Sequence, residues 1–590
     1  MFVKERNKIP LPTQNIQIRL ALVYPNLYEM GMSSYTVHLL YSLFNSYPGI
    51  RCERFFIPNK KDTVNSMKSM DSGSNLADFD VIAFTIHYEL DYENVLWVLD
   101  TLHIPYFGNN RQENNYPLII AGGSAVKSNP LLLLPFMDLL VFGDLEPVFE
   151  NLCQSLVKIF ENNQNFHDFI NKPNLKILQD SCFLPNVIIC KYALQHLSSE
   201  NTEYSLFPVN RKHLGNLDES ICPIRQILPQ FQSSEDNLVF GETFLLEINR
   251  GCPSGCRFCL TGYINRPFRN RSFSQIKHII DESIKNTGAK KITLIGSAVA
   301  DHPNFLEICQ YIVDKGLQIM IPSIRIDRIT PEILSILRRG RVKSLAIAPE
   351  TGSDVLRRTL NKGICNSDVV EKCKWIFTEG FHSIKLYFLI GVPFETPDDI
   401  LAIVDLVKNI ILKSGTSIPK NGIRLSINPF IPKLFTPYNG YTFHFIDKKM
   451  QYIRNTEKFL QSELKKLPNV ECEFLNWKES RLQAILSQLD ETFAPLLVEF
   501  YENGALPVTM NILDKQKGNI VTKFLQDTFD TFTISQSTEW SSYSESIQMK
   551  KLQKIINTGF RNGYLLHELK SAKSGKLFSC EVDCNHCGIC

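Results

Sequence analysis

The feature of this sequence that most restricts its fold is the alternation of short, continuously apolar runs with longer segments of helical character. A helix is expected at 33–45, after the first of these runs. The runs of the N-terminal part lie at 18–24, 79–86, 117–121 and 139–142. Strands that are apolar on both faces belong to parallel sheets that helices cover on both sides. We therefore predict an α/β protein whose first domain, residues 1–195, is Rossmann-like and doubly wound.

The same alternation resumes after the first domain and predicts a second parallel sheet within residues 238–440. Six strand-like runs are separated by helical segments, at 243–248, 292–295, 318–321, 344–348, 384–390 and 423–427. Six such units are typical of a partial (β/α)6 barrel. In both fold types ligands bind beyond the carboxyl ends of the strands, so functional residues are expected in the loops that follow them.

The remaining segments have weaker patterns. Residues 196–237 lose the period and gain Ser, Asn, Pro and Gln, which indicates a linker. Residues 441–575 are predicted to be mainly helical, with a Ser- and Thr-rich loop at 531–546 and a helix at 548–560. Residues 576–590 form a Cys-rich tail.

Charge and composition name no partner but exclude several classes. The chain has 63 Lys and Arg against 61 Asp and Glu, a net charge of +2, and 44% hydrophobic residues. Neither a strong basic field nor extended disorder is therefore expected. No signal peptide is recognisable at 1–15, and no run is long and apolar enough for a membrane span. We expect a soluble cytoplasmic protein without a membrane partner, whose 16 cysteines serve metal or redox chemistry in preference to disulfides.

The first of two cysteine groups directly follows the first strand of the predicted barrel. Cys252, Cys256 and Cys259 have the spacing C-x3-C-x2-C. Three thiolates on one short loop can bind a cubane and leave its fourth iron open, whereas a closed zinc site would need a fourth nearby donor. An open iron indicates catalysis.

The second group, Cys580, Cys584, Cys587 and Cys590, lies at the C-terminus with the spacing C-x3-C-x2-C-x2-C. This dense spacing resembles ferredoxin-like cluster binding more than the two separated pairs of a zinc ribbon. Three interpretations stay open: an auxiliary Fe-S cluster, a zinc site, or a thiol tail that delivers an electron or a sulfur atom.

The Cys252 loop, with Phe258 before its last cysteine and a strand before its first, resembles the signature of the radical S-adenosylmethionine superfamily. Further blocks resemble a largely uncharacterised group of that superfamily with an N-terminal cobalamin (B12)-binding-like domain: 24–33, 121–123, 250–252, 348–352, 385–391 and the Cys-rich end. The resemblance implies that Cys252, Cys256 and Cys259 bind a 4Fe-4S cluster that chelates S-adenosylmethionine. One electron, from a reductant such as flavodoxin or ferredoxin, then yields a 5'-deoxyadenosyl radical that abstracts a substrate hydrogen.

The resemblance also implies roles for residues at the strand ends. Phe258 matches a position near the adenine, and Gly391 and Pro393 match a turn that lets the backbone approach the same ring. Arg325 and Glu350 match polar positions used for the carboxylate and ribose, although each could instead form an ordinary ion pair. Gly296 and Ser297 lie at the glycine-rich turn, where Ser297 and Ala298 replace the acidic residue that binds the methionine amine in the family. No residue that touches substrate is identified.

Two further patterns leave alternatives open. Cobalamin binders of the base-off type carry Asp-x-His-x-x-Gly after their first strand, but residues 26–32 contain no histidine. Either cobalamin binds here without a protein ligand, or the pocket has a substrate or structural role. The basic run 265–271, with aromatic neighbours, could hold nucleic acid or phosphate, or its arginines could pair with carboxylates of the barrel.

The sequence therefore predicts a radical S-adenosylmethionine enzyme that modifies an unidentified substrate, with methyl or methylthio transfer as one option. The alternative is a non-catalytic Fe-S or zinc-bearing RNA-binding or assembly factor on the same scaffold.

Overall fold

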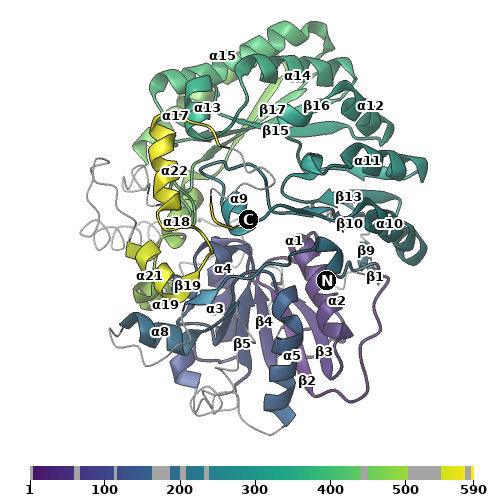
Figure 1. Cartoon of the computed structure of the whole chain (residues 1–590), viewed down its shortest axis with the longest axis vertical. Coiled ribbons are helices and arrows are strands. Elements are labelled where there is room, and N and C mark those ends of the chain that lie inside the picture. Colours follow the sequence, from purple (N-terminus) through teal and green to yellow (C-terminus); the bar gives the residue numbers. More distant parts are fainter. Residues whose placement is uncertain are drawn as a thin grey trace.

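The computed structural model describes residues 4–58, 67–111, 116–161, 186–198, 208–230, 238–439, 441, 450–502, 547–578 and 587–589. Figure 1 shows two α/β units, the N-terminal one in purple and blue and the barrel in teal and green, with the C-terminal helices in yellow along one side. No helix among these described ranges combines the length and apolar character that a membrane crossing requires.

The N-terminal unit is built on a sheet of six strands in the order β3-β2-β4-β5-β6-β7. The first five are parallel and β7 is antiparallel to β6. The strands are β2 (Ile18–Tyr24), β3 (Ile50–Phe56), β4 (Val81–Thr85), β5 (Leu118–Gly122), β6 (Leu139–Val141) and β7 (Val187–Ile189). The order of the parallel strands is that of flavodoxin-like doubly wound sheets, and the predicted α/β class is confirmed.

Helices cover both faces of this sheet because neighbouring residues of each strand point to opposite sides. Leu20 and Leu22 of β2 pack in one cluster with α2 (Tyr35–Ser46) and α5 (Glu146–Glu161). Ala21 and Val23 pack in the other cluster, with α3 (Tyr92–Thr101). Continuous apolar character in β2 is the consequence of this two-sided burial.

All six strands predicted for the barrel are present, and they form two parallel sheets. The first has the order β10-β13-β14 and the second β15-β16-β17-β18, and the Ile324 N–H donates across the gap to the Ala346 carbonyl at 2.9 Å. The bounds are β10 (Phe244–Glu247), β13 (Lys291–Ile295), β14 (Gln318–Met320), β15 (Ser344–Glu350), β16 (Ser383–Ile390), β17 (Ile423–Pro429) and β18 (Val470–Phe474). The main covering helices are α10 (Phe273–Thr287), α11 (Phe305–Asp314), α12 (Pro331–Arg339), α14 (Asn366–Thr378) and α15 (Pro397–Ser414).

Strand β18 is an element that the prediction of a mainly helical segment at 441–575 did not include. It adds a seventh parallel strand to the barrel at a sheet edge. Glu471 and Glu473 alternate with less polar residues in it, and this half-exposed pattern lacks the continuous apolar run by which the other strands were recognised. Helices α17 (Gln451–Leu464), α18 (Trp477–Leu486) and α19 (Ala494–Glu502) follow the predicted helical pattern.

The predicted linker carries two short strands that join distant parts of the chain. Strand β9 (Leu228–Gln230) pairs with β1 (Lys4–Arg6), and β8 (Val209–Asn210) pairs with β19 (Ile556–Asn557). The helix predicted at 548–560 is α21 (Ile547–Ile555), which ends where β19 begins, and α22 (Tyr564–Lys573) follows. The loop predicted at 531–546 lies outside the described residues.

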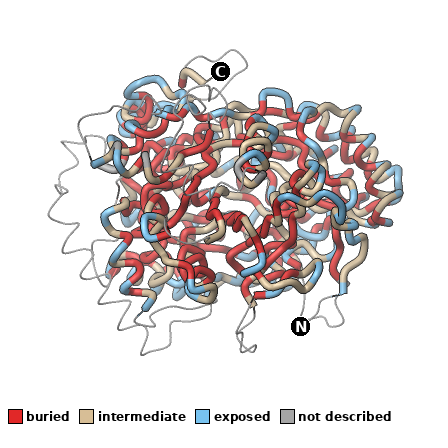
Figure 2. The backbone as a smooth tube through the Cα atoms, turned by 90° about the horizontal axis from the view of Figure 1, so that it is seen from below, coloured by how far each residue is buried: buried red, intermediate tan, exposed pale blue. Residues whose placement is uncertain are grey.

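The carboxyl edge of the N-terminal sheet lies against the carboxyl edge of the barrel. Glu89, after β4, pairs with Lys433, after β17, and Asp144, after β6, pairs with Arg269 of the barrel at 2.7 Å. Buried residues of both units belong to one apolar cluster, and Figure 2 shows buried backbone throughout the interior. The two edges at which α/β folds bind ligands therefore meet at one junction.

Candidate functional site

The cysteine loop begins at this junction, directly after the short strand β11 (Asn249–Arg250), which pairs with β12 (Arg269–Asn270). Cys252, Cys256 and Cys259 are free thiols and partly exposed. Burial raises the pKa of Cys256 to about 12 and also raises that of Cys259. A bound metal must therefore supply the positive charge that favours the thiolates.

The three thiols are soft donors of the kind that bind Fe-S clusters. In the part of the chain that the structure describes, no three His, Cys, Asp or Glu side chains are grouped closely enough to hold one metal ion. A cubane spreads its thiolate ligands over separate irons, so three soft donors on one loop fit its corners without meeting at one point.

Arg257, between the second and third cysteines, anchors the loop in the interior. Its fully buried guanidinium pairs with the Glu568 carboxylate of α22 at 3.2 Å and donates to the Thr359 carbonyl at 3.0 Å and the Lys576 carbonyl at 2.6 Å. The Asn361 amide donates to the Gly255 carbonyl at 2.9 Å. Segments far away in the sequence therefore fix the position of the loop.

Arg325 and Glu350 lie beside this loop, as predicted, and each also has an ion-pair partner. Arg325 donates to the Ser254 hydroxyl and pairs with Asp327 at 2.6 Å. Glu350 has a left-handed backbone (φ 66°) and pairs at 2.8 Å with Lys362. The ammonium of Lys362 also interacts electrostatically with the Cys256 thiol. The alternative of an ordinary ion pair and the cofactor role are thus both compatible with these positions.

Gly296 lies where β13 approaches the strand that leads into the cysteine loop. A Cβ atom there would come within 2.0 Å of Asn249 Oδ1, so any larger residue would require the Asn249 side chain to move. Ser297 is exposed. Asp301, four residues later, has a buried carboxylate that pairs with Arg328 at 2.8 Å and lies 3.7 Å from Arg325. The sequence reasoning missed Asp301 because it looked for an acid only next to the glycine.

Phe258, Gly391 and Pro393 converge on the other side of the loop. Phe258 packs in one apolar cluster with Val392 and Phe394, and Pro393 is buried. Gly391 has φ 75° and donates its N–H to Glu395 at 2.8 Å, to which the Tyr452 hydroxyl also donates at 2.7 Å. Burial raises the pKa of Glu395 to about 7.

The basic run 265–271 is not a nucleic-acid surface. Arg266, Arg269 and Arg271 are all buried. Arg266 donates to the Tyr564 hydroxyl at 3.1 Å, Arg269 pairs with Asp144 of the N-terminal unit, and Arg271 donates to the Ser220 carbonyl at 3.1 Å. The one charged partner among these, Asp144, belongs to the N-terminal unit, and the other partners are neutral oxygens, while Nη2 of Arg271 has no hydrogen-bond partner among the described residues. The expected pairing with barrel carboxylates is therefore corrected as well.

Of the C-terminal cysteines, Cys580, Cys584 and Cys590 lie outside the described residues. Cys587 is buried, and its carbonyl accepts a hydrogen bond from the Arg561 N–H at 2.9 Å. Phe578, in the tail and before its first cysteine, exchanges two hydrogen bonds of 2.8 Å with Asn361, the residue that also holds Gly255 of the cysteine loop.

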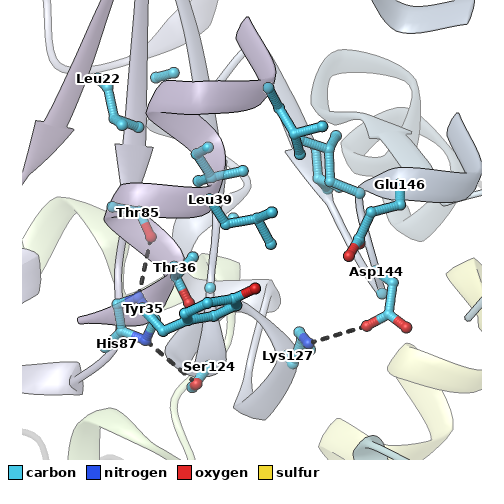
Figure 3. A pocket seen from close by; sticks show the side chains of 18 of the residues that line it. Leu22, Tyr35, Thr36, Leu39, Thr85, His87, Ser124, Lys127, Asp144 and Glu146 are labelled. Carbon is cyan, nitrogen blue, oxygen red and sulfur yellow. Dashed lines mark hydrogen bonds and ion pairs between the residues drawn. The ribbon is translucent and has the colours of Figure 1, made fainter. Parts of the chain in front are cut away.

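A cavity of about 240 Å³ opens at the carboxyl ends of β4, β5 and β6, between the sheet and α2. Figure 3 shows His87 beside Thr85 and Ser124, with Lys127 and Asp144 at the opposite side. Arg250 borders the cavity and pairs with Glu247 at 2.9 Å, Glu146 at 2.8 Å and Asp144 at 3.4 Å. Arg250, which borders the cavity, comes two residues before Cys252, so the cavity reaches the start of the cysteine loop.

Comparison with known proteins agrees with this geometry. A family model described as the radical SAM superfamily matches residues 246–407, and one for the N-terminal region of radical SAM proteins matches residues 36–177. An uncharacterized protein of Methanocaldococcus jannaschii is 27% identical over 85% of this chain and 97% of its own length. A tRNA-2-methylthio-N(6)-dimethylallyladenosine synthase of Natranaerobius thermophilus is 21% identical over 42% of this chain and 58% of its own.

Among solved structures, the cobalamin-dependent S-adenosylmethionine radical enzyme OxsB with aqua-cobalamin bound has a similar fold, with a TM-score of 0.50 at 13% identity over 94% of this chain and 84% of that one. The chain thus belongs to the radical SAM superfamily, with an N-terminal unit of B12-binding-like architecture, and this membership implies an iron-sulfur 4Fe-4S cluster and S-adenosylmethionine as its cofactors.

Proposed function

We propose that the protein is an enzyme that cleaves S-adenosylmethionine reductively to modify an organic substrate held at the junction of its two sheets, with Cys252, Cys256 and Cys259 as the cluster ligands. The observation that carries this proposal is the position of three free thiols on one loop at the carboxyl edge of the barrel. When bound, the cluster supplies the electron that breaks the sulfonium bond.

The chain's own residues then bind and orient S-adenosylmethionine. Arg325 offers a cation to its carboxylate, and Glu350 can accept hydrogen bonds from the ribose hydroxyls while Lys362 balances its charge. Asp301 supplies the carboxylate that Ser297 and Ala298 lack, for the methionine ammonium. Side chains that complement the carboxylate, the ammonium and the ribose hydroxyls of S-adenosylmethionine thus surround the loop on the side of β13, β14 and β15.

The adenine is assigned to the opposite side of the loop. Phe258 and Pro393 offer apolar surface there, and the left-handed turn at Gly391 brings backbone close without a side chain. Glu395 fixes that turn through the Gly391 N–H. Packing of Phe258 against this turn also excludes water from the cysteine loop.

Methyl or methylthio transfer is the reaction type we propose within this class. The 21% identical relative is named as a methylthio-forming synthase, and such a transfer needs a second source of the transferred group. The Cys-rich tail is one candidate source, as an auxiliary Fe-S cluster whose sulfide could supply sulfur, and the tie between Phe578, Asn361 and Gly255 supports its nearness to the loop. A corrinoid at the N-terminal unit is the other, since OxsB, of similar fold, carries aqua-cobalamin, but the contacts of Glu89 with Lys433 and of Glu146 with Arg250 argue against a corrinoid inside the cavity of this chain.

The alternative of a non-catalytic RNA-binding or assembly factor has less support. The basic run 265–271 was the segment that could have held nucleic acid, and its arginines are buried and unavailable to RNA.

Anaerobic reconstitution with iron and sulfide, followed by S-adenosylmethionine and dithionite in place of flavodoxin or ferredoxin, tests the proposal. We expect 5'-deoxyadenosine from the native chain and none from the triple variant Cys252→Ala, Cys256→Ala, Cys259→Ala. Cys472→Ser, in a partly exposed cysteine of β18, is the matched control and should keep full activity. Equal nucleoside release from the triple variant would refute the assignment.

A further inference from the structure

The cavity of the N-terminal unit contains binding capacity that the chemistry proposed above does not use. One end is apolar and lined by Leu22, Leu39, Leu43 and Ile120, from β2, α2 and β5. The other end carries hydroxyl groups and charged side chains, as Figure 3 shows. Such a division between an apolar body and a polar end is typical of sites for small organic ligands.

Tyr35 projects from α2 into this cavity with an unsatisfied hydroxyl. Its side chain is buried, and within the described structure the hydroxyl makes no hydrogen bond to a nitrogen or oxygen atom; its polar neighbour is the thiol of Cys222, a weak hydrogen-bonding group. Figure 3 shows the hydroxyl directed toward the side of the cavity that holds Asp144 and Glu146. A buried hydroxyl without a strong partner is costly, so a ligand that accepts or donates a hydrogen bond there would gain binding free energy.

Lys127 brings a cation to the same end, at the edge of a charge group whose carboxylates pair more closely with arginines. Its ammonium lies 4.0 Å from the carboxylate of Asp144, which already pairs with Arg269 at 2.7 Å and with Arg250 at 3.4 Å. Its ammonium also donates to Asn265 Oδ1 at 3.3 Å. An ammonium has three donors, and burial lowers the pKa of Lys127, as expected for a cation that lacks a close counter-ion.

We propose that this cavity binds a small organic acid, with its acidic group on Lys127 and Tyr35 and an apolar body about the size of a benzene ring against α2 and the sheet. The volume of about 240 Å³ supports this size, because an apolar cavity of about 150 Å³ holds benzene. The remaining space suits one carboxylate or phosphate group.

A corrinoid is a poorer occupant because the barrel contacts the sheet edge on both sides of the cavity. Glu89 after β4 accepts hydrogen bonds from Lys433 and, at 2.9 Å, from Gln483, and Glu146 after β6 pairs with Arg250. A flat macrocycle would have to break these contacts to lie across the edge. The proposed acid fits beneath them, and its binding does not depend on radical chemistry.

Isothermal titration of the full, reconstituted chain tests the site with benzoate, phenyl phosphate and the neutral isostere benzamide. We expect benzoate or phenyl phosphate to bind at least tenfold more tightly than benzamide, and the stronger of the two identifies the acidic group. Lys127→Met should weaken that acid at least tenfold and leave benzamide unchanged, and Tyr35→Phe should weaken it severalfold. Lys408→Met, on an exposed lysine of α15, is the matched control and should change nothing.

Leu39→Phe, which fills the apolar end, should weaken all three ligands and keeps the test valid if Lys127→Met does not fold. Melting temperature and iron content establish folding of each variant. The proposal is overturned if neither acid binds the native chain, if benzamide binds as well as the acids, or if Lys127→Met has no effect on acid binding. Retention of aqua-cobalamin on gel filtration, lost in Leu39→Phe, would assign the cavity to a corrinoid and also overturn it.

Discussion

Arg250 is the residue at which the N-terminal unit, the barrel and the cysteine loop meet, and its removal gives a sharp prediction. Three buried carboxylates, Asp144, Glu146 and Glu247, face three cations, Arg250, Arg269 and Lys127, so this group of charges is neutral. Arg250→Met leaves one negative charge in excess. Burial alone would raise the pKa of Glu146, but Arg250 beside it holds that pKa below its usual value.

The cost follows from the burial of the pairs. Removing one partner of a buried ion pair costs about 3–5 kcal/mol because the other charge stays buried. Every 1.4 kcal/mol is a factor of about ten in an equilibrium constant. Local opening at the junction should therefore become about 10²- to 4 × 10³-fold more populated in Arg250→Met.

Glu146→Gln provides the critical control because it restores the balance of charge. On its own it should destabilise the junction, since it leaves one positive charge in excess. Combined with Arg250→Met it leaves two carboxylates against two cations, so the double variant should be more stable than Arg250→Met alone. Two destabilising substitutions that partly cancel are expected only if the charges act as one group.

Hydrogen exchange read by mass spectrometry measures this opening. Peptides covering 247–271 report on the Arg271 N–H, which donates to the Ile248 carbonyl at 2.9 Å. Arg424→Met, on an exposed arginine of β17, is the comparison variant and should leave these peptides unchanged. Unaltered exchange in Arg250→Met, or a double variant less protected than both single variants, would refute the reasoning.

Three further predictions concern other parts of the chain. The pKa of Glu395 is raised to about 7 in the folded state, so its carboxyl is protonated more readily there than in the unfolded chain. Stability should therefore fall as pH rises from about 4.5 to 7. Melting temperatures across this range should fall less in Glu395→Gln than in the native chain, and identical curves would contradict the assignment. In Gly352→Ala the new Cβ would lie 2.1 Å from the Ile403 nitrogen, so the melting temperature should drop by about 5 °C or more, whereas Gly215→Ala, with open space around it, should leave it unchanged. Replacing Cys580, Cys584, Cys587 and Cys590 by alanine should lower the iron content from about eight to about four per chain, while about four irons plus one zinc in the native chain would show that the tail is not an Fe-S site.

The parallel strands of both units could be predicted from the sequence because two-sided burial leaves a strong local signal. The run 18–24 is apolar except for Arg19, and the run 384–390 is apolar except for Lys385; both became central strands. Strand β18 carries two glutamates at a sheet edge and gave no such signal. The pairing of β9 with β1 depends on contacts more than two hundred residues apart, which local pattern cannot reveal.

The candidate site was predictable where one short motif carries the chemistry, as in the three cysteines. It was not predictable where an apolar or ionic environment decides the role. The arginines of 265–271 look like a basic surface in the sequence, but they are buried. Asp301 and Lys362 are unremarkable in the sequence and gain significance only because the fold brings them to Arg325 and to Glu350.

The contacts of the cysteine loop explain why the accessory segments belong to the site. Arg257 needs the Lys576 carbonyl and pairs with Glu568, while Arg250 pairs with Glu146, so partners come from both ends of the chain. A barrel without these segments would keep its strands but leave two arginines of the loop region without the oxygens that hold them. Because a buried guanidinium without partners is strongly unfavourable, the loop would have to move and expose it. The geometry of the three thiols is therefore a property of the whole fold, and the junction of the two sheets positions the loop as well as enclosing the site.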